Sequence, residues 1–210
     1  MAQAPSMNAH RLKYPLGPSS FSAASLGGAS RVAVAPPLGD LEDRLQYRGR
    51  DLVIRPLRPE DISSYRRFLA QIERQDLYTR FFVYMRQLPE EDVIHLTHID
   101  YDREMAFVAV ACQGAGESEI LGVARVCSDP GNVAAEFAVL VRSDLKHQGL
   151  GSILVQKLIR YCRARGVQRL WANVLCENTA MLHLAKSVGF QVRSSEGNME
   201  VIELNLQDQG

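Results

Sequence analysis

Residues 134–165 carry the pattern best suited to chemistry, because an apolar strand runs there into a polar loop and then a helix. Gly149 and Gly151 stand at the predicted start of that helix. Glycine lets backbone N–H groups come close to a ligand, and the unpaired N–H groups in the first turn of a helix attract anions. The pattern therefore predicts a phosphate cradle, to which three side chains can add contacts: Lys146, His147 and Ser152.

Two common phosphate-binding signatures are absent from this stretch. The sequence contains no G-x-x-x-x-G-K-[ST], and Gly149-x-Gly151 continues to Leu154 where G-x-G-x-x-G requires a third glycine. A tight turn into an ordinary helix remains the alternative interpretation of the two glycines.

The elements that position the cradle follow from apolar periodicity and from turn residues. Short Gly- and Asn-containing connections after the second and third strands favour antiparallel hairpins. The expected order of elements is βααβββαβαββ. The strands are expected at 51–57, 105–112, 119–127, 133–141, 169–175, 190–195 and 199–206, and the helices at 58–72, 89–99, 149–165 and 178–187.

The start of the chain differs in composition from the rest. Residues 1–45 are rich in Ser, Ala, Pro and Gly and show no apolar period, so they are expected to form a disordered extension. Residues 46–210 are expected to form one domain. The scarcity of acids before Asp40 also fits an organellar transit peptide, whereas no apolar segment precedes a cleavage site for secretion.

Composition narrows the classes of function. Lys+Arg and Asp+Glu balance at 24 each, which gives no general attraction to nucleic acid or to an anionic membrane. No apolar run is long enough to span a bilayer. The four cysteines are scattered and are read as reduced thiols of a cytoplasmic protein. His95 and His98 lack a third ligand, so no metal site is expected.

The cradle and its surroundings resemble the GNAT superfamily of N-acetyltransferases over residues 50–206. The family signature is [Q/R]-x-x-G-x-[G/A], and Lys146 stands where it has Gln or Arg. Asn178 and Gly189-Phe190 resemble motifs that follow in the same family. The resemblance implies an α/β fold with a mixed, mostly antiparallel sheet of about seven strands, helices on both faces, and acetyl-CoA as acyl donor.

Three segments are similar to bacterial protein lysine acetyltransferases of the Pat type: 77–82, 99–106 and 135–141. This similarity implies acetylation of protein lysines, with acyl-CoA synthetases as candidate partners and a monomer or homodimer as the assembly. Two alternatives stay open: an N-acetyltransferase for small amines, and a non-catalytic acyl-CoA-binding regulator.

The resemblance implies Glu136 as the general base. The usual spacing places the family's glutamate nearer Ala135, and a one-residue shift turns a side chain to the other face, so a β-bulge in this strand is expected. The alternatives are that Glu136 is solvated or pairs with Arg125. The usual tyrosine acid is replaced by Ala185, for which Tyr78, Tyr101 or Cys176 are possible substitutes.

The other site residues that the resemblance implies fall into two sets. Residues expected at the cofactor are Val139, Leu140, Val141, Lys146, His147, Gln148, Gly149, Leu150, Gly151, Ser152 and Asn178. Residues expected at the acceptor are Tyr78, Arg80, Asp100 and Asp102.

Overall fold

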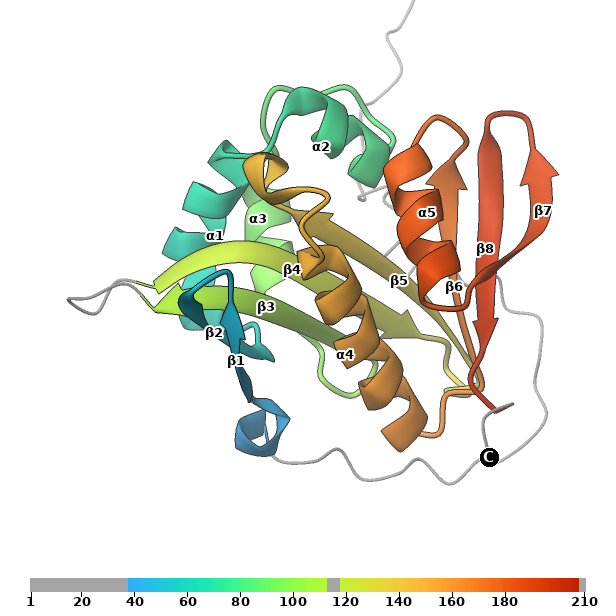
Figure 1. Cartoon of the computed structure of the whole chain (residues 1–210), viewed down its shortest axis with the longest axis horizontal. Helices are drawn as coiled ribbons and strands as arrows, with labels where there is room; N and C mark the ends of the chain where they lie inside the picture. The colour runs from blue at the N-terminus through green and yellow to red at the C-terminus, as the bar shows by residue number, and fades with distance from the viewer. Residues whose placement is uncertain (1–37, 113–117, 208–210) are drawn as a thin grey trace, which may run out of the picture.

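One mixed sheet of eight strands forms the centre of the molecule, in the order β1-β2-β3-β4-β5-β6-β8-β7 (Figure 1). The computed structural model describes residues 38–112 and 118–207. The strands are β1 (Asp43–Tyr47), β2 (Arg50–Pro56), β3 (Glu104–Cys112), β4 (Ser118–Ser128), β5 (Ala134–Val141), β6 (Arg169–Leu175), β7 (Gln191–Glu196) and β8 (Met199–Asn205).

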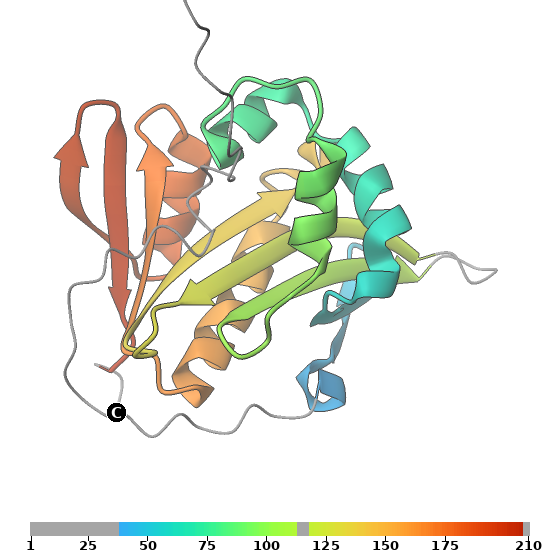
Figure 2. The same cartoon turned by 180° about the vertical axis from the view of Figure 1, so that it is seen from behind.

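Helices cover both faces of the sheet. Helix α4 (Leu150–Ala164) and α5 (Thr179–Ser187) lie on one face, as Figure 1 shows. Helices α1 (Ile62–Ala70), α2 (Arg74–Phe81) and α3 (Glu90–Thr97) lie on the other side (Figure 2). Short 3₁₀ turns are η1 (Leu38–Leu41), η2 (Pro59–Asp61) and η3 (Ser143–Leu145).

The two faces of the sheet bury two separate apolar clusters. Alternate residues of β3 divide between them, with Phe107 packing on the α4 side and Val108 on the side of α1–α3. Helix α4 presents one fully buried stripe to the sheet, which includes Leu154 and Leu158. This is the two-layer burial expected when amphipathic helices cover a pleated sheet.

The sheet opens between β5 and β6. These two strands run parallel, and their ladder contains only the pairs Ala134–Arg169, Ala135–Leu170 and Glu136–Trp171. Beyond Glu136 the strands diverge, with β5 staying on β4 and β6 staying on β8 (Figure 1). The divergence leaves one edge of β5 available for a ligand.

Most of the expected elements are confirmed, including the antiparallel pairing of β3 with β4 and of β4 with β5. Two elements were not predicted: β1 and α2. Strand β1 pairs with β2, so the folded domain begins before the expected boundary at residue 46. Of the extension 1–45 that was expected to be disordered, residues 1–37 lie outside the described residues, whereas Leu38–Leu41 form η1 and β1 begins at Asp43.

The expected bulge in β5 is not present. The register between β4 and β5 is continuous from Ser128–Ala135 to Gly122–Val141. A register shift occurs instead in the neighbouring ladder, between Ala109 and Val110 of β3. Within residues 38–112 and 118–207, no helix is long and apolar enough to cross a membrane.

Candidate active site

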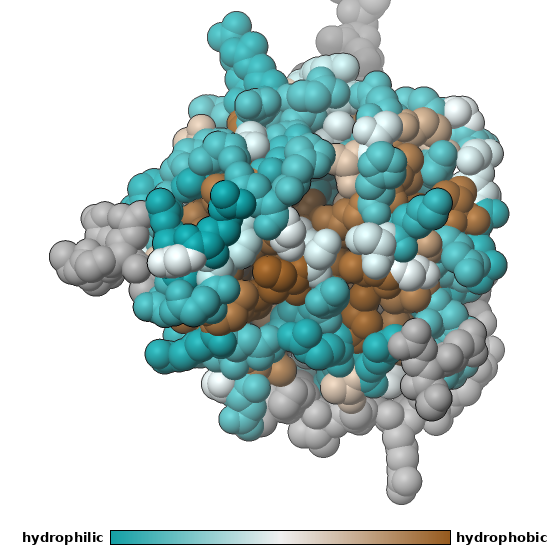
Figure 3. Space-filling view, viewed as in Figure 1, coloured by the Kyte–Doolittle hydropathy of each residue, from teal (hydrophilic) through white to brown (hydrophobic). Residues whose placement is uncertain are grey.

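A cavity of about 390 Å³ occupies the opening between β5 and β6. Its walls come from four places: the second half of β5, the first turn of α4, the middle of β6, and one side of α5. Helix α2 lies at the end of the opening and contributes Asp76, Thr79 and Arg80 (Figure 1). Figure 3 shows apolar atoms on this face of the molecule, over the region where α4 and α5 lie.

The loop before α4 has the backbone shape of an anion cradle. Gly149 lies at φ +88° and His147 at φ 59°, both in the left-handed region. Helix α4 begins at Leu150, so its free N–H groups open toward the cavity that Gly149, Gly151 and Ser152 line. Turns of this kind and a helix N-terminus together suit a phosphate group.

The free edge of β5 offers backbone groups to the same cavity. Arg142 N–H donates to Leu121 O on β4 at 2.9 Å. In an antiparallel pair the residues alternate in the side to which their backbone groups point. The N–H and C=O groups of Val139 and Val141 therefore point away from β4, into the opening.

Glu136 lies where the β5–β6 ladder ends and lines the cavity. Glu136 is 2% exposed, and its Oε2 has no hydrogen-bond partner among the described residues. Burial raises the pKa of this carboxyl to about 8, although the charge of Arg80 acts to lower it. Burial in turn lowers the pKa of Arg80 to about 10. Glu136 is therefore a buried carboxyl with a pKa near neutrality.

Both alternatives for Glu136 are contradicted by its surroundings. The carboxyl is buried, so it is not on a solvated face. Arg125 pairs with Glu104, with 2.8 Å between Nη1 and Oε2, and donates a second hydrogen bond to Leu96 O. The residue across from Glu136 on β4 is Cys127, whose thiol pKa burial raises to about 11.

The structure brings together nearly all of the residues expected at the cofactor. All of them line the cavity except Gln148, whose side chain donates to Asp144 O at 3.0 Å. Asn178 lines the cavity and also caps α5, since its Oδ1 accepts from Met181 N–H at 3.1 Å.

The residues expected at the acceptor are dispersed. Arg80 lines the cavity, whereas Tyr78 turns aside and stacks on Tyr84 with 3.9 Å between ring centroids. Asp100 and Asp102 belong to the turn before β3, where Asp100 O accepts from Arg103 and Glu104, and they do not line the cavity. Their short polar side chains suit that turn, which explains their positions without a ligand.

The candidate acids at the leaving thiol are likewise outside the cavity lining. Tyr101 donates to Leu57 O at 2.7 Å, and Cys176 is exposed. Ala185 is 1% exposed and packs in the core.

Several cavity residues were missed from the sequence. They include Asp76 and Thr79 on α2, Ala172, Asn173 and Val174 on β6, and Met181, His183, Leu184 and Ser187 on α5. On β6, alternation was the available signal, because a polar Asn173 interrupts an otherwise apolar strand. For Asp76 no local signal existed, since its place depends on how α2 packs.

Comparisons with known proteins agree with this geometry. The model of the acetyltransferase (GNAT) family matches residues 70–190. An acetyltransferase of Pseudomonas aeruginosa is 31% identical over 68% of this chain and 76% of its own length. Acetyltransferase Pat of Mycolicibacterium smegmatis is 30% identical over 67% of this chain, but over only 41% of its own length.

Solved structures share the fold. The GNAT domain of S. lividans PAT superposes with a TM-score of 0.71 at 25% identity, over 79% of this chain and 97% of that domain. A Salmonella typhimurium protein superposes with a TM-score of 0.60 at 18% identity, over 75% of this chain and 95% of that one. That protein was solved with its cofactor acetyl-CoA. This chain belongs to the acetyltransferase (GNAT) family and is an N-acetyltransferase.

Proposed function

We propose that this enzyme acetylates lysine side chains of proteins, with Glu136 as the general base. The observation that carries the proposal is the buried carboxyl of Glu136 at the point where the sheet opens. It lines the cavity, and its Oε2 has no hydrogen-bond partner among the described residues. A free buried carboxylate oxygen costs stability, and such groups occur where a ligand completes them.

The geometry supports direct transfer. A lysine amine with a pKa near 10.4 is neutral in only about one part in a thousand at pH 7, so a base must remove its proton. Glu136, with a pKa of about 8, takes that proton in its ionised form, which is about one tenth of the enzyme at pH 7 and a larger share at higher pH. The neutral amine nitrogen then attacks the thioester carbon, and the excess proton on that nitrogen passes to solvent. The carbon–sulfur bond breaks to release CoA as thiolate.

Backbone groups of β5 assist the same step. The N–H groups of Val139 and Val141 point into the opening, where one of them polarises the thioester oxygen as in an oxyanion hole. Ala185 places no acid beside the sulfur, and the CoA thiolate leaves without protonation by a side chain at that position.

A protein acceptor is supported by the relatives and by the surface beside the cavity. The similarity to the Pat relatives covers 67% and 79% of this chain, so it extends well beyond the cradle. Tyr84 is 74% exposed on the segment after α2, stacked on Tyr78, and so presents an aromatic surface that a polypeptide flanking the lysine can cover. Small amines remain the second candidate, because one fold serves many acceptors.

The acceptor is tested with purified enzyme, [¹⁴C]acetyl-CoA and four acceptors: an acyl-CoA synthetase, a lysine peptide, a peptide with only an α-amine, and spermidine. Mass spectrometry then locates the acetyl group. We expect turnover on protein lysines. Turnover confined to spermidine or to the α-amine would refute the protein-lysine proposal.

The base is tested with Glu136→Gln. This substitution is expected to lower kcat by about 10²–10⁴ while acetyl-CoA affinity stays near wild type. Glu90→Gln serves as the matched control, because Glu90 is exposed and pairs with Arg66 away from the cavity lining. Near-wild-type kcat in Glu136→Gln would remove this carboxyl from the mechanism.

A further inference from the structure

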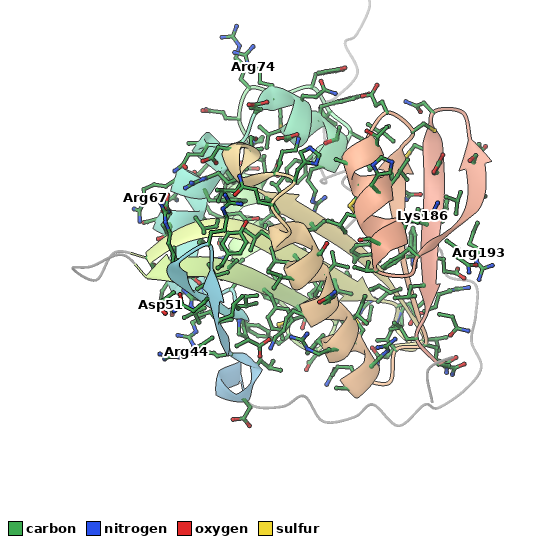
Figure 4. All side chains as sticks on the ribbon, viewed as in Figure 1. Arg44, Asp51, Arg67, Arg74, Lys186 and Arg193 are labelled. Carbon is green, nitrogen blue, oxygen red and sulfur yellow. The ribbon has the colours of Figure 1, made fainter. Side chains whose placement is uncertain are left out.

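Asp76 is the least expected group at the cavity. It lies in the first turn of α2 and is 8% exposed, whereas Arg74, two residues earlier, points out into solvent (Figure 4). A buried carboxylate requires partners, and both of its oxygens have one. Those partners come from the loop between β5 and α4, about 70 residues further along the chain.

The contacts form one connected network. Lys146 Nζ lies 2.6 Å from Asp76 Oδ1, and Ser143 Oγ donates to Asp76 Oδ2 at 2.6 Å. The same Ser143 Oγ accepts from the backbone N–H of Glu73 at 2.9 Å. The start of α2 is thus attached to the cradle loop through side chain and backbone together.

We propose that Asp76 is a positioning residue. It attaches α2 to the loop between β5 and α4 through Lys146 and Ser143, and so holds Arg80 at the end of the cavity that Glu136 lines. The inference goes beyond the identity of the acceptor, because it concerns how the cofactor loop and the acceptor side are joined.

Helix geometry links the attachment to the chemistry. Asp76 and Arg80 are four residues apart and share one face of α2, and both line the cavity. Arg80 cannot keep its place beside Glu136 if the turn that contains Asp76 moves away from the loop. A displacement of about 1 Å at a catalytic centre costs up to about a hundredfold in rate.

The network also gives Lys146 a role different from simple attraction of phosphate. Its ammonium is paired with a carboxylate at 2.6 Å, so the pair has no net charge toward an anionic ligand. The cradle then relies on backbone N–H groups for the phosphates, and Lys146 joins the cradle to α2. Removing Asp76 therefore leaves acetyl-CoA affinity intact or increases it.

A double-mutant cycle tests this role. Asp76→Asn and Lys146→Gln are each expected to lower kcat about tenfold, with the acetyl-CoA Kd of Asp76→Asn no weaker than wild type. The double variant is expected to lose no more than either single variant, because both break one contact. Lys146→Arg is expected to recover most of the kcat lost in Lys146→Gln. Asp144→Asn is the matched control, since Asp144 is exposed, pairs with Arg142 and does not line the cavity.

Amide hydrogen exchange supplies a readout that needs no acceptor. Residues 74–81 are expected to exchange faster in Asp76→Asn than in wild type, both with and without CoA, while α4 keeps its protection. Losses in kcat that add in the double variant, or unchanged exchange of 74–81, would overturn the proposal. If no amine is acetylated by the wild type, the proposed function fails while the exchange result still decides the role of Asp76.

Discussion

At the scale of single residues, the buried carboxyl of Glu136 makes the stability of the protein depend on pH. Its pKa of about 8 in the folded protein lies above the ordinary value of 4.5, so the folded state holds a proton that the unfolded chain releases between these pH values. Its contribution to stability is complete below about pH 4 and is lost as the pH rises through about 8, at up to about 1.4 kcal/mol per pH unit.

Glu136→Gln should therefore stabilise the protein in alkaline solution. The amide cannot ionise, so the free energy of unfolding of the variant relative to wild type should be roughly 4 kcal/mol higher at pH 9 than at pH 5. Urea unfolding at the two pH values measures this difference. A gap that is equal at both pH values would mean that the carboxyl is not held protonated by burial.

Residue types and spacing predicted part of the site. Glu136 could be singled out because it is the one acid in an apolar strand, and Gly149 and Gly151 because glycine pairs before a helix suit phosphate. Asp100 and Asp102, which were predicted at the acceptor, do not line the cavity, since acidic residues in a turn serve the backbone as readily as a ligand. The position of Asp76 depends on a contact with Lys146, 70 residues further along the chain, and the local sequence pattern does not predict such a contact.

At the scale of elements, α4 and α5 approach each other closely at Gly151. A Cβ at this position would lie 2.6 Å from Leu184 Cδ1, and Leu184 lines the cavity. Gly151→Ala should therefore push that side chain into the cofactor site. We expect acetyl-CoA affinity to fall, because the displaced Leu184 side chain takes up space that the ligand needs.

Calorimetric titration with acetyl-CoA measures the effect, and a second background isolates its cause. In Leu184→Ala the clashing methyl group is gone, so adding Gly151→Ala there should change the affinity little. An equal loss in both backgrounds would instead point to the backbone of α4.

Helices and strands could be predicted from the sequence where an apolar pattern extends over many residues. Helix α4 runs over four turns with one apolar stripe, and β3 to β5 are almost continuously apolar, so their bounds were found within a few residues. Helix α2 was missed because its eight residues are mostly polar, and it is held by burial of Leu77 and Phe81. Strand β1 was missed because only Tyr47 in it is buried.

At the scale of the whole molecule, two groups of strands share one ligand site. Strands β1–β5 and β6–β8 are joined by a ladder of three residue pairs, and the core under α4 and α5 runs beneath both groups. Acetyl-CoA in the opening would touch β5, α4, β6 and α5 at once. Binding should therefore stabilise the complete fold, since the site does not exist in the unfolded chain.

Thermal unfolding tests this coupling. Acetyl-CoA at 100 times its Kd should add about 2.7 kcal/mol, which raises the Tm of a chain of this size by roughly 5–10 °C. Glu136→Gln should show the same ligand-induced increase, because its side chain serves the transfer and not the cofactor. Gly151→Ala should show a smaller increase at the same acetyl-CoA concentration, since its Kd is weaker. If Glu136→Gln lost the increase while Gly151→Ala kept it, the division between Glu136 as base and the α4 cradle as cofactor site would be wrong.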